Sequence, residues 1–492
     1  MPHADGVRRS PCCLPSATSL RAMSDPHGPG ANADAPRNFP PTHLTNADAA
    51  AATVGIDTHQ VAAVAAQNAR KGRIFAWGLW DWGSAAFNAV ITTFVFTVYL
   101  TSSSFGPSGT VEAQLGWALA AAGLLIALLA PITGQRSDSS GRRKFWLAVN
   151  TYLVVAISAA MFFVEPSPEF LMLGLVLVAT GNIFFEFASV NYNAMLAQVS
   201  TPRSIGRVSG FGWGMGYIGG IVLLLIVYFG LISPEVGLFG VTSDNGMDIR
   251  VTMLIAAAWF GIFALPVLFA VPEYKAPAGV KRDKVGFFAS YARLGRDIAK
   301  LWKESRQTVW FLLASAVFRD GLAGVFTFGG VLAASVFGFS AGEVIIFAIA
   351  ANVVAGISTI TVGALDDKLG AKPVIMAALI GLIISGLLIF LLHDGGQIVF
   401  WTAGLALCLF VGPAQSASRT FLARLIPPGR EGEVFGLYAT TGRAVSFLAP
   451  TMFALFVTWF GAPYFGILGI VVVIAIGLAM LIPVKAVQEQ LR

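Results

Sequence analysis

Long apolar runs alternate with short polar segments along most of the chain. From Ile74 onward, each run is long enough to cross a hydrocarbon core of roughly 30 Å at about 1.5 Å per helical residue. The first group of runs spans residues 75–102, 113–133, 145–164, 170–196, 208–232 and 251–271. A second group spans residues 308–337, 342–363, 373–392, 398–423, 434–460 and 462–483. The pattern predicts an all-α integral membrane fold with twelve transmembrane helices in two six-helix halves.

Polar segments flank and divide these two halves. Residues 1–73 are rich in Ala, Pro, Asp and Asn and have no apolar period, which predicts a disordered tail. Its start, "VRRSPCCLPS", lacks the apolar core of a secretory signal peptide. A polar segment at 273–306 separates the N-terminal half, 74–272, from the C-terminal half, 307–484, and residues 485–492 form a C-terminal tail.

The middle segment, "VKRDKVGFFASYARLGRDIAKLWKESR", has the pattern of an amphipathic helix. Its apolar residues recur roughly at helical spacing and are Phe288, Tyr291, Leu294, Ile298, Leu301 and Trp302. Basic residues cover the rest of the helix, so we expect it to lie on the cytoplasmic leaflet. A linker attracted to anionic lipid is favoured over a regulatory site.

Composition excludes several classes of protein. Hydrophobic residues make up 56% of the chain and charged residues only 12%, too few charges to cover the surface of a soluble protein of 492 residues. The net charge of +6 comes from basic residues that alternate along the chain rather than forming one patch, so we expect no nucleic-acid partner. With three cysteines there is no disulfide framework or zinc spacing, and we expect no metal or other cofactor.

Lys and Arg occupy alternate loops, and this sets the orientation. Besides the middle segment, the basic side holds Arg70, Lys71, Arg73, Arg136, Arg142, Arg143, Lys144, Arg203, Arg207, Lys368, Lys372, Arg424, Arg430, Lys485 and Arg492. The opposite loops, such as "TSSSFGPSGT" and "VEPSPEF", contain no Lys or Arg, and Arg250 alone sits at that face. Because cytoplasmic loops carry the excess of Lys and Arg, both termini are predicted to be cytoplasmic.

Two similar loops occupy corresponding positions in the halves. "GQRSDSSGRRKFW" (134–146) joins the second and third runs, and "GALDDKLGAKPVI" (363–375) joins the eighth and ninth. We assign both to the pattern G-x-x-x-D-x-x-G-x-[RK], with Gly134, Asp138, Gly141 and Arg142 in the first and Gly363, Asp367, Gly370 and Lys372 in the second. The glycines permit a tight turn and close helix approach, while the Asp can meet a helix N-terminus. A repeat of this kind, once per half, indicates an internal duplication.

These loops resemble the signature of the major facilitator superfamily. Ser139 departs from it, since a basic residue usually follows the Asp; Lys368 keeps that charge in the second half. Within the superfamily, "WDWGSAAFNAVITTFVFTVYL", "NYNAMLAQVS", "GFGWGMGYIGG", "FRDGL" and "GPAQSASRTFLARLIPPGREGEVFGLYATTGRAVSFLAP" resemble the vacuolar effluxer-like family, which includes the fungal vacuolar amino-acid effluxer and bacterial relatives. The resemblance implies transport by rocking two halves about a central cavity, with amino acids the best-known substrates. It also suggests the plasma membrane of a bacterium.

One acid lies in the first apolar run. Asp81 shares a helix face with Ser84 and Asn88, at i+3 and i+7, and an unpaired charge facing lipid costs roughly 2.5–3.5 kcal/mol on insertion scales. We expect this face to turn inward. A structural ion pair and a cavity contact with substrate or proton both remain open for Asp81.

The fourth run carries a polar stripe. Its members, at i, i+4, i+7 and i+11, are Asn182, Glu186, Ser189 and Asn193. The resemblance implies that an acid at the position of Glu186 pairs with the loop arginine, so a gate contact with Arg142 and a substrate contact are both open. The predicted cytoplasmic gate consists of Glu186, Lys368 and the residues assigned to the two loop patterns, which are Gly134, Asp138, Gly141, Arg142, Gly363, Asp367, Gly370 and Lys372.

The C-terminal half carries buried charges of its own. Arg319 and Asp320 lie about 17 Å along the seventh run and Arg443 about 14 Å along the eleventh. We expect Asp320, Gln415, Tyr438 and Arg443 to line the central cavity with Asp81, Asn88 and Asn182 from the first half. Arg443 could grip a carboxylate with two hydrogen bonds, or form a structural pair with Asp320.

The predicted function is therefore secondary transport of a small polar solute by a monomer in the lipid bilayer. An amino acid is one candidate solute, proton coupling one candidate energy source, and sugars or organic acids are alternatives. A non-transporting sensor or scaffold is an alternative of another class, disfavoured because no added soluble domain is recognisable. We do not expect an enzyme, because all five histidines lie in the tail or an outer loop.

Overall fold

The computed structural model describes residues 58–107, 110–201, 203–273, 292, 296, 299–303, 305–339, 341–426 and 430–485. The chain divides into two units, Met1–Ala63 and Val64–Arg492. The only described residues of the first unit, 58–63, are helical. The second unit holds the helices discussed below, and the described residues contain no strand.

Among the described residues, the N-terminal half contains six helical segments that follow the predicted runs. The first consists of the helix α2 (Thr58–Ala85), the π-helix η1 (Ala86–Phe94) and the short helix α3 (Phe96–Leu100). The others are α4 (Thr110–Ser140), α5 (Arg143–Ala160), α6 (Pro168–Ala194), α8 (Ile205–Val227) and α9 (Met247–Ala270). A one-turn helix, α7 (Leu196–Val199), joins α6 to α8.

The described helices of the C-terminal half follow the second group of predicted runs. The first three are α11 (Arg306–Ser335), α12 (Ala341–Leu369) and α13 (Ala371–Leu391). The fourth is built from α14 (Gln397–Val399), the π-helix η7 (Phe400–Gly404) and α15 (Leu405–Leu425). The last two are α16 (Glu431–Val445) followed by α17 (Leu448–Phe460), and α18 (Phe465–Leu481).

The all-α membrane fold predicted from the apolar runs is confirmed. Among the described residues, eleven helical stretches are long and apolar enough to cross a membrane. The twelfth predicted run corresponds to α18, whose 17 residues span about 25 Å. The protein is therefore an integral, multi-pass membrane protein.

One predicted boundary differs from the structure, and others lie outside the described residues. The first helix begins at Thr58, so residues 58–73 are helical rather than disordered, in keeping with the high helix propensity of the alanines in "VAAVAAQNARKG". Residues 1–57 lie outside the described part, as do most of the linker 273–306 and the tail after Lys485. In the described stretch 299–303, which is helical, Leu301 is buried and Trp302 is 42% exposed.

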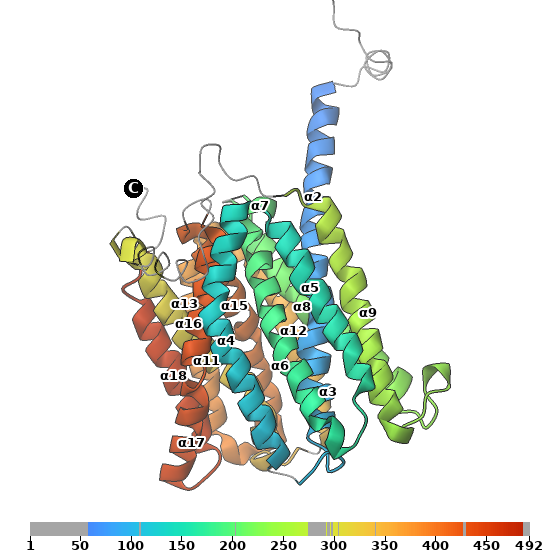
Figure 1. Cartoon of the computed structure of the whole chain (residues 1–492). Coiled ribbons are helices and arrows are strands. Elements are labelled where there is room, and N and C mark those ends of the chain that lie inside the picture. Colours follow the sequence, from blue (N-terminus) through green and yellow to red (C-terminus); the bar gives the residue numbers. More distant parts are fainter. Residues whose placement is uncertain are drawn as a thin grey trace, which may run out of the picture. The chain divides into compact units, whose positions relative to one another are not determined.

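The two halves meet along two seams, in which α4 lies beside α16 and α8 lies beside α12 (Figure 1). The helix ends at the loops 134–146 and 363–375 are the ends that touch the other half. Glycines line both seams: a Cβ on Gly210 would lie 2.5 Å from the carbonyl oxygen of Thr359, and one on Gly436 would lie 2.6 Å from that of Ala130. Only glycine lets the backbones approach this closely. We call this end of the bundle, defined by the two loops, the loop side.

Candidate functional site

A cavity of about 480 Å³ lies between the two halves, a size typical of small-molecule sites. Its described polar lining comes from both halves and comprises Asp81, Ser84, Asn88, Thr93, Trp213, Tyr217, Asn352 and Gln415. Within that described lining Asp81 is the one carboxylate, and there is no Lys or Arg. The cavity therefore suits a group that is positively charged or a hydrogen-bond donor at its polar end.

Asp81 stands at the boundary between the cavity and the loop side. Its Oδ2 accepts a hydrogen bond from the Tyr192 hydroxyl at 2.9 Å and lies 3.6 Å from Nη1 of Arg419. The side chain of Asp81 is 17% exposed, and that of Arg419 is 4% exposed. The ion pair expected as one role for Asp81 is thus present, and its carboxylate also faces the cavity.

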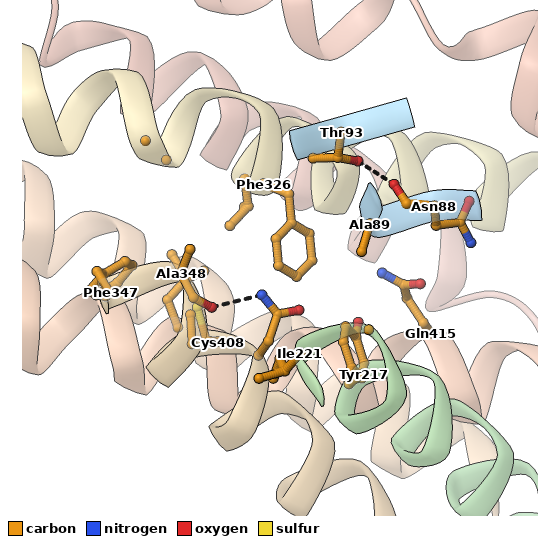
Figure 2. Close-up of a pocket in the computed structure, with 18 of the residues that line it drawn as sticks. Asn88, Ala89, Thr93, Tyr217, Ile221, Phe326, Phe347, Ala348, Cys408 and Gln415 are labelled. Carbon is orange, nitrogen blue, oxygen red and sulfur yellow. Dashed lines mark hydrogen bonds between the residues drawn. The ribbon is translucent and has the colours of Figure 1, made fainter. Parts of the chain in front are cut away.

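Two side-chain amides point into the same space from different halves. Figure 2 shows Asn88 on η1 and Gln415 on α15 directed into the pocket. Neither amide has a hydrogen-bond partner among the described residues. Asn88 lies in a π-helix, where the Thr93 hydroxyl donates to the Asn88 carbonyl at 2.7 Å, five residues back. π-Helical segments are frequent at functional sites, because the wider turn re-aims side chains.

Away from Asp81 the cavity is apolar and extends into the C-terminal half. This lobe is lined by α11, α12, α13, α15, η7 and α18, with side chains that include Val325, Phe347, Leu382, Ile389, Phe400, Leu407, Ile470 and Val471. The second π-helix, η7, contributes Phe400 and Gly404. The site thus combines one polar end with an apolar body.

Contacts between the halves close the cavity on the loop side. On α8 the lining runs from Trp213 to Leu224, whereas Gly206–Gly210 touch the other half. On α15 the lining runs from Leu407 to Gln415, and Ser416 and Arg419, which follow it, bond to Ser209 of the other half. The loop side is therefore sealed in this conformation, and the cavity lies beyond the seal.

One part of the seal joins α4 and α5 to α16. Asp138 Oδ1 pairs with the Arg143 guanidinium at 2.6 Å, and Asp138 Oδ2 accepts from the backbone N–H of Glu433 at 2.9 Å. Arg143 also pairs with Glu431 at 2.5 Å. Behind this network, a Cβ on Gly134 would overlap the backbone of Gly432. Asp138 thus meets the N-terminus of α16, as the loop pattern predicts.

The second loop makes the matching contact with α8. Asp367 accepts from the backbone N–H groups of Gly206 at 2.7 Å and Arg207 at 3.1 Å, and from the Arg207 side chain at 3.0 Å. Arg424 pairs with Asp366 at 2.6 Å. A Cβ on Gly363 would lie 2.7 Å from the carbonyl oxygen of Gly206. The two loops therefore hold the two seams in the same way.

The turn glycines of both loops are needed for their backbone shape. Gly141 has φ 65° and Gly370 has φ 90°, the region that favours glycine. Each lies where one helix ends and the next begins, between α4 and α5 and between α12 and α13. Lys372 donates to the Ile482 carbonyl at 2.9 Å, and Lys368 is exposed.

The arginine that completes the first loop network is Arg143 rather than Arg142, and Glu186 has a partner other than Arg142. Arg142 is exposed, and its neighbour Arg143 makes the contacts with Asp138. Counting the motif from Gly141 with one intervening residue reaches Arg143, and adjacent helical residues point about 100° apart. Glu186 instead pairs with Arg443 at 3.2 Å.

Four residues expected in the cavity lie outside its described lining. Arg443 donates to Asn182 at 3.2 Å as well as pairing with Glu186, so the expected pair with Asp320 is absent among the described residues. Asp320 accepts from the backbone N–H of Ala449 at 2.6 Å, close to the start of α17. The fourth, Tyr438, shares a hydrogen bond of 2.8 Å between its hydroxyl and that of Ser418.

Two arginines that were not among the candidate site residues make important contacts. Arg419 bonds to Ser209 and Asn193 of the other half, and the guanidinium of Arg319 lies 3.7 Å from the Tyr438 ring centre and donates to the Tyr438 carbonyl. Both lie in apolar runs, where an arginine is expected to have a partner; this placement singled out Arg319 as a buried charge in the sequence and is the signal for Arg419 as well. Among the described residues, no three His, Cys, Asp or Glu side chains gather into a group that could hold a metal ion.

Comparisons with known proteins agree with this architecture. The family model described as "Vacuole effluxer Atg22 like" matches residues 197–490. The chain is 26% identical over 410 residues to the uncharacterized MFS-type transporter YxiO of Bacillus subtilis (strain 168), covering 82% of this chain and 93% of that protein. It is 24% identical over 291 residues to autophagy-related protein 22 of Cryptococcus neoformans var. neoformans serotype D (strain B-3501A), covering 56% of this chain and 52% of that protein, so the chain spans about half the length of that relative.

Solved structures show the same fold at low identity. The proton:xylose symporter XylE, of the major facilitator superfamily, matches with a TM-score of 0.68 and 14% identity over 85% of this chain and 97% of that chain. The major facilitator transporter FucP in its outward conformation matches with a TM-score of 0.59 and 15% identity over 84% of this chain and 97% of that chain. These matches establish the fold class predicted from the loops.

Proposed function

Because the chain belongs to the vacuole effluxer Atg22-like family of the major facilitator superfamily, we propose that it is a secondary transporter that moves a small polar solute across the membrane by alternating access. The observation that carries this proposal is the cavity between the halves, which has a carboxylate at one end and is closed off from the loop side by ion pairs between the halves. Such a site can be exposed to each side in turn if the two halves rock about it.

The solute we propose carries an amino group, and amino acids are the leading class. An ammonium would meet the carboxylate of Asp81, and a carboxylate or amide on the same solute would meet the free amides of Asn88 and Gln415. The apolar lobe would receive the solute's side chain. The earlier expectation that Arg443 grips a carboxylate has less support, because Arg443 lies outside the described lining and already pairs with Glu186.

The gate we propose consists of the two loop networks on the loop side. Its N-terminal part is Asp138 and Arg143 with Glu431. Its C-terminal part is Asp367 with the helix that begins at Ile205, beside the pair of Asp366 with Arg424. Following the distribution of Lys and Arg, we place the loop side in the cytoplasm of a bacterium, with the cavity open to the outside.

We also propose that transport is coupled to protons. Asp81 is the one carboxylate in the described lining, and carboxylates inside a membrane often serve as proton carriers. The solved structures of XylE and of the fucose:proton symporter FucP, which share the fold, are described as those of proton symporters.

A ligand-stabilisation screen tests this function. The thermal unfolding of the purified protein is measured with amino acids, dipeptides, sugars and organic acids, since a ligand at 100 times its Kd stabilises the folded state by about 2.7 kcal/mol. We expect amino acids to raise the Tm of the wild type and not that of Asp81→Asn. Asp394→Asn is the matched control, because its side chain is 96% exposed on an outer loop. Stabilisation by sugars alone, unaffected by Asp81→Asn, would overturn the proposed solute class and site.

A further inference from the structure

Arg419 of the C-terminal half is bound almost entirely by residues of the N-terminal half. Its Nε donates to the Ser209 hydroxyl at 3.0 Å, its Nη2 to the Ser209 carbonyl at 2.7 Å, and its Nη1 to the Asn193 side chain at 3.1 Å. The Arg419 side chain is 4% exposed. One guanidinium thus fastens α15 to both α8 and α6, just on the loop side of the cavity.

Three aromatic rings of the N-terminal half surround the same guanidinium. Its central carbon lies 5.1 Å from the ring centre of Trp77, 5.9 Å from that of Tyr192 and 5.6 Å from that of Trp213. Aromatic faces attract a cation, so these rings favour the charged guanidinium in a space that excludes water. We call Trp77, Tyr192 and Trp213 the aromatic box.

The countercharge of Arg419 is a residue of the cavity. Asp81, at 3.6 Å, is the one acid that forms an ion pair with Arg419 among the described residues. The same carboxylate lines the cavity and accepts the Tyr192 hydroxyl. Anything that binds or neutralises Asp81 from the cavity therefore removes the countercharge from a buried guanidinium, which leaves that charge uncompensated.

Resting on the proposed function, we propose that Arg419 is the positioning residue that couples occupancy of the cavity to opening of the loop side. A cationic group of the solute at Asp81 takes over the carboxylate, and Arg419 then leaves the aromatic box. Release of Arg419 breaks its bonds to Ser209 and Asn193, so α15 separates from α8 and α6. Arg419 itself touches no solute and acts through Asp81.

The test uses the full chain without any transported solute. Spin labels are placed at Ser139→Cys and Leu369→Cys in a variant that lacks the native cysteines. Both positions are exposed at the loop side, one in each half, so double electron–electron resonance distances between them lengthen when that side opens. We call these two labels the reporter pair.

Asp81→Asn mimics a neutralised carboxylate and keeps an oxygen that accepts the Tyr192 hydroxyl. We expect it to raise the ratio of long to short reporter distances by on the order of tenfold, whereas Asp394→Asn leaves the ratio unchanged. Methylammonium chloride, compared with equal sodium chloride, should lengthen the distances in the wild type and have no further effect in Asp81→Asn. Distances that stay at the wild-type values in Asp81→Asn, or a wild type that does not respond to methylammonium, would overturn the proposal.

Variants of Arg419 separate coupling from a merely structural role. Arg419→Gln should open the loop side, and Arg419→Lys, which keeps the charge opposite Asp81, should stay more closed. The double variant Asp81→Asn/Arg419→Gln should open no further than Arg419→Gln, because each change removes the same interaction, the ion pair between Asp81 and Arg419. Additive opening would contradict the coupling. Thermal unfolding of each variant checks that it is folded.

Failure of this proposal and failure of the proposed function are distinguishable. Suppose that the ligand screen finds a solute whose stabilisation of the protein requires Asp81, while the reporter distances are the same in the wild type and in Asp81→Asn. The proposed transport function is then supported and the role of Arg419 is refuted. If the variants open as expected and the screen finds no ligand, the coupling stands and the proposed solute class is refuted.

Discussion

Adding one methyl group at Gly134 should open the loop side without changing any charge. A Cβ on this residue would overlap the carbonyl group of Gly432 in the other half, lying 2.5 Å from its carbon and 3.1 Å from the Glu433 nitrogen. Ordinary contacts between such atoms are about 3.5 Å, and the Gly432 carbonyl oxygen lies closest to the added Cβ, so α4 and α16 must separate by about 1.5 Å for Gly134→Ala to be accommodated. Backbone lies on both sides of this contact, and no side chain can turn away to relieve it.

The size of the effect follows from the cost of overpacking. Such an insertion destabilises a packed arrangement by about 1–3 kcal/mol. Here the penalty applies to the conformation in which the loop side is closed, since the contact exists only when α4 and α16 touch. A penalty of about 1–3 kcal/mol shifts the balance between the closed and open conformations by roughly 5- to 150-fold.

The assay is the distance between the reporter pair, measured with and without Gly134→Ala. The matched control is Gly123→Ala on the same helix, where a Cβ would meet nothing within 4 Å. We expect longer distances in Gly134→Ala and wild-type distances in Gly123→Ala. If Gly134→Ala leaves the distances unchanged in a folded protein, the seam between α4 and α16 does not hold the loop side closed and the reasoning fails.

Three further variants test individual contacts. Glu431→Gln should open the loop side by the same assay, because Arg143 loses its ion pair with the opposite half; unchanged distances would contradict this. Asp320→Ala should lower the Tm by more than Asp320→Asn, since it leaves the Ala449 N–H without its acceptor at a cost of about 1–3 kcal/mol; equal Tm values would refute it. Arg443→Ala should leave stabilisation by amino acids intact. Loss of that stabilisation in the screen would show that Arg443 contributes to solute binding.

The fold could be predicted from the sequence, because membrane helices are recognisable by their length and apolarity. Runs such as 170–196 match the helix Pro168–Ala194 closely. The duplicated loops also located the seal, since Asp138 and Asp367 both meet helix N-termini in the opposite half. A break inside the eleventh run, at Ser446–Phe447, was not visible in its hydropathy.

The candidate site was only partly predictable, for a geometric reason. Depth along a helix follows from residue counting, but the neighbour that a side chain meets depends on how the helix is rotated and packed. Asp81 and Gln415 do line the cavity, whereas Arg443 at a similar depth meets the polar stripe of α6 instead. The choice of Arg142 over Arg143 was an error of one residue, which turns a side chain by about 100°.

Uptake by proteoliposomes tests most directly the claim that a cavity centred on Asp81 carries an amino-group solute across the membrane. The purified protein is reconstituted, and uptake of a mixture of radiolabelled amino acids is followed for the wild type, Asp81→Asn, Asp394→Asn and protein-free liposomes. The account predicts saturable uptake by the wild type and Asp394→Asn, and uptake by Asp81→Asn no greater than that of protein-free liposomes. Equal uptake by the wild type and Asp81→Asn, or by the wild type and protein-free liposomes, would contradict it.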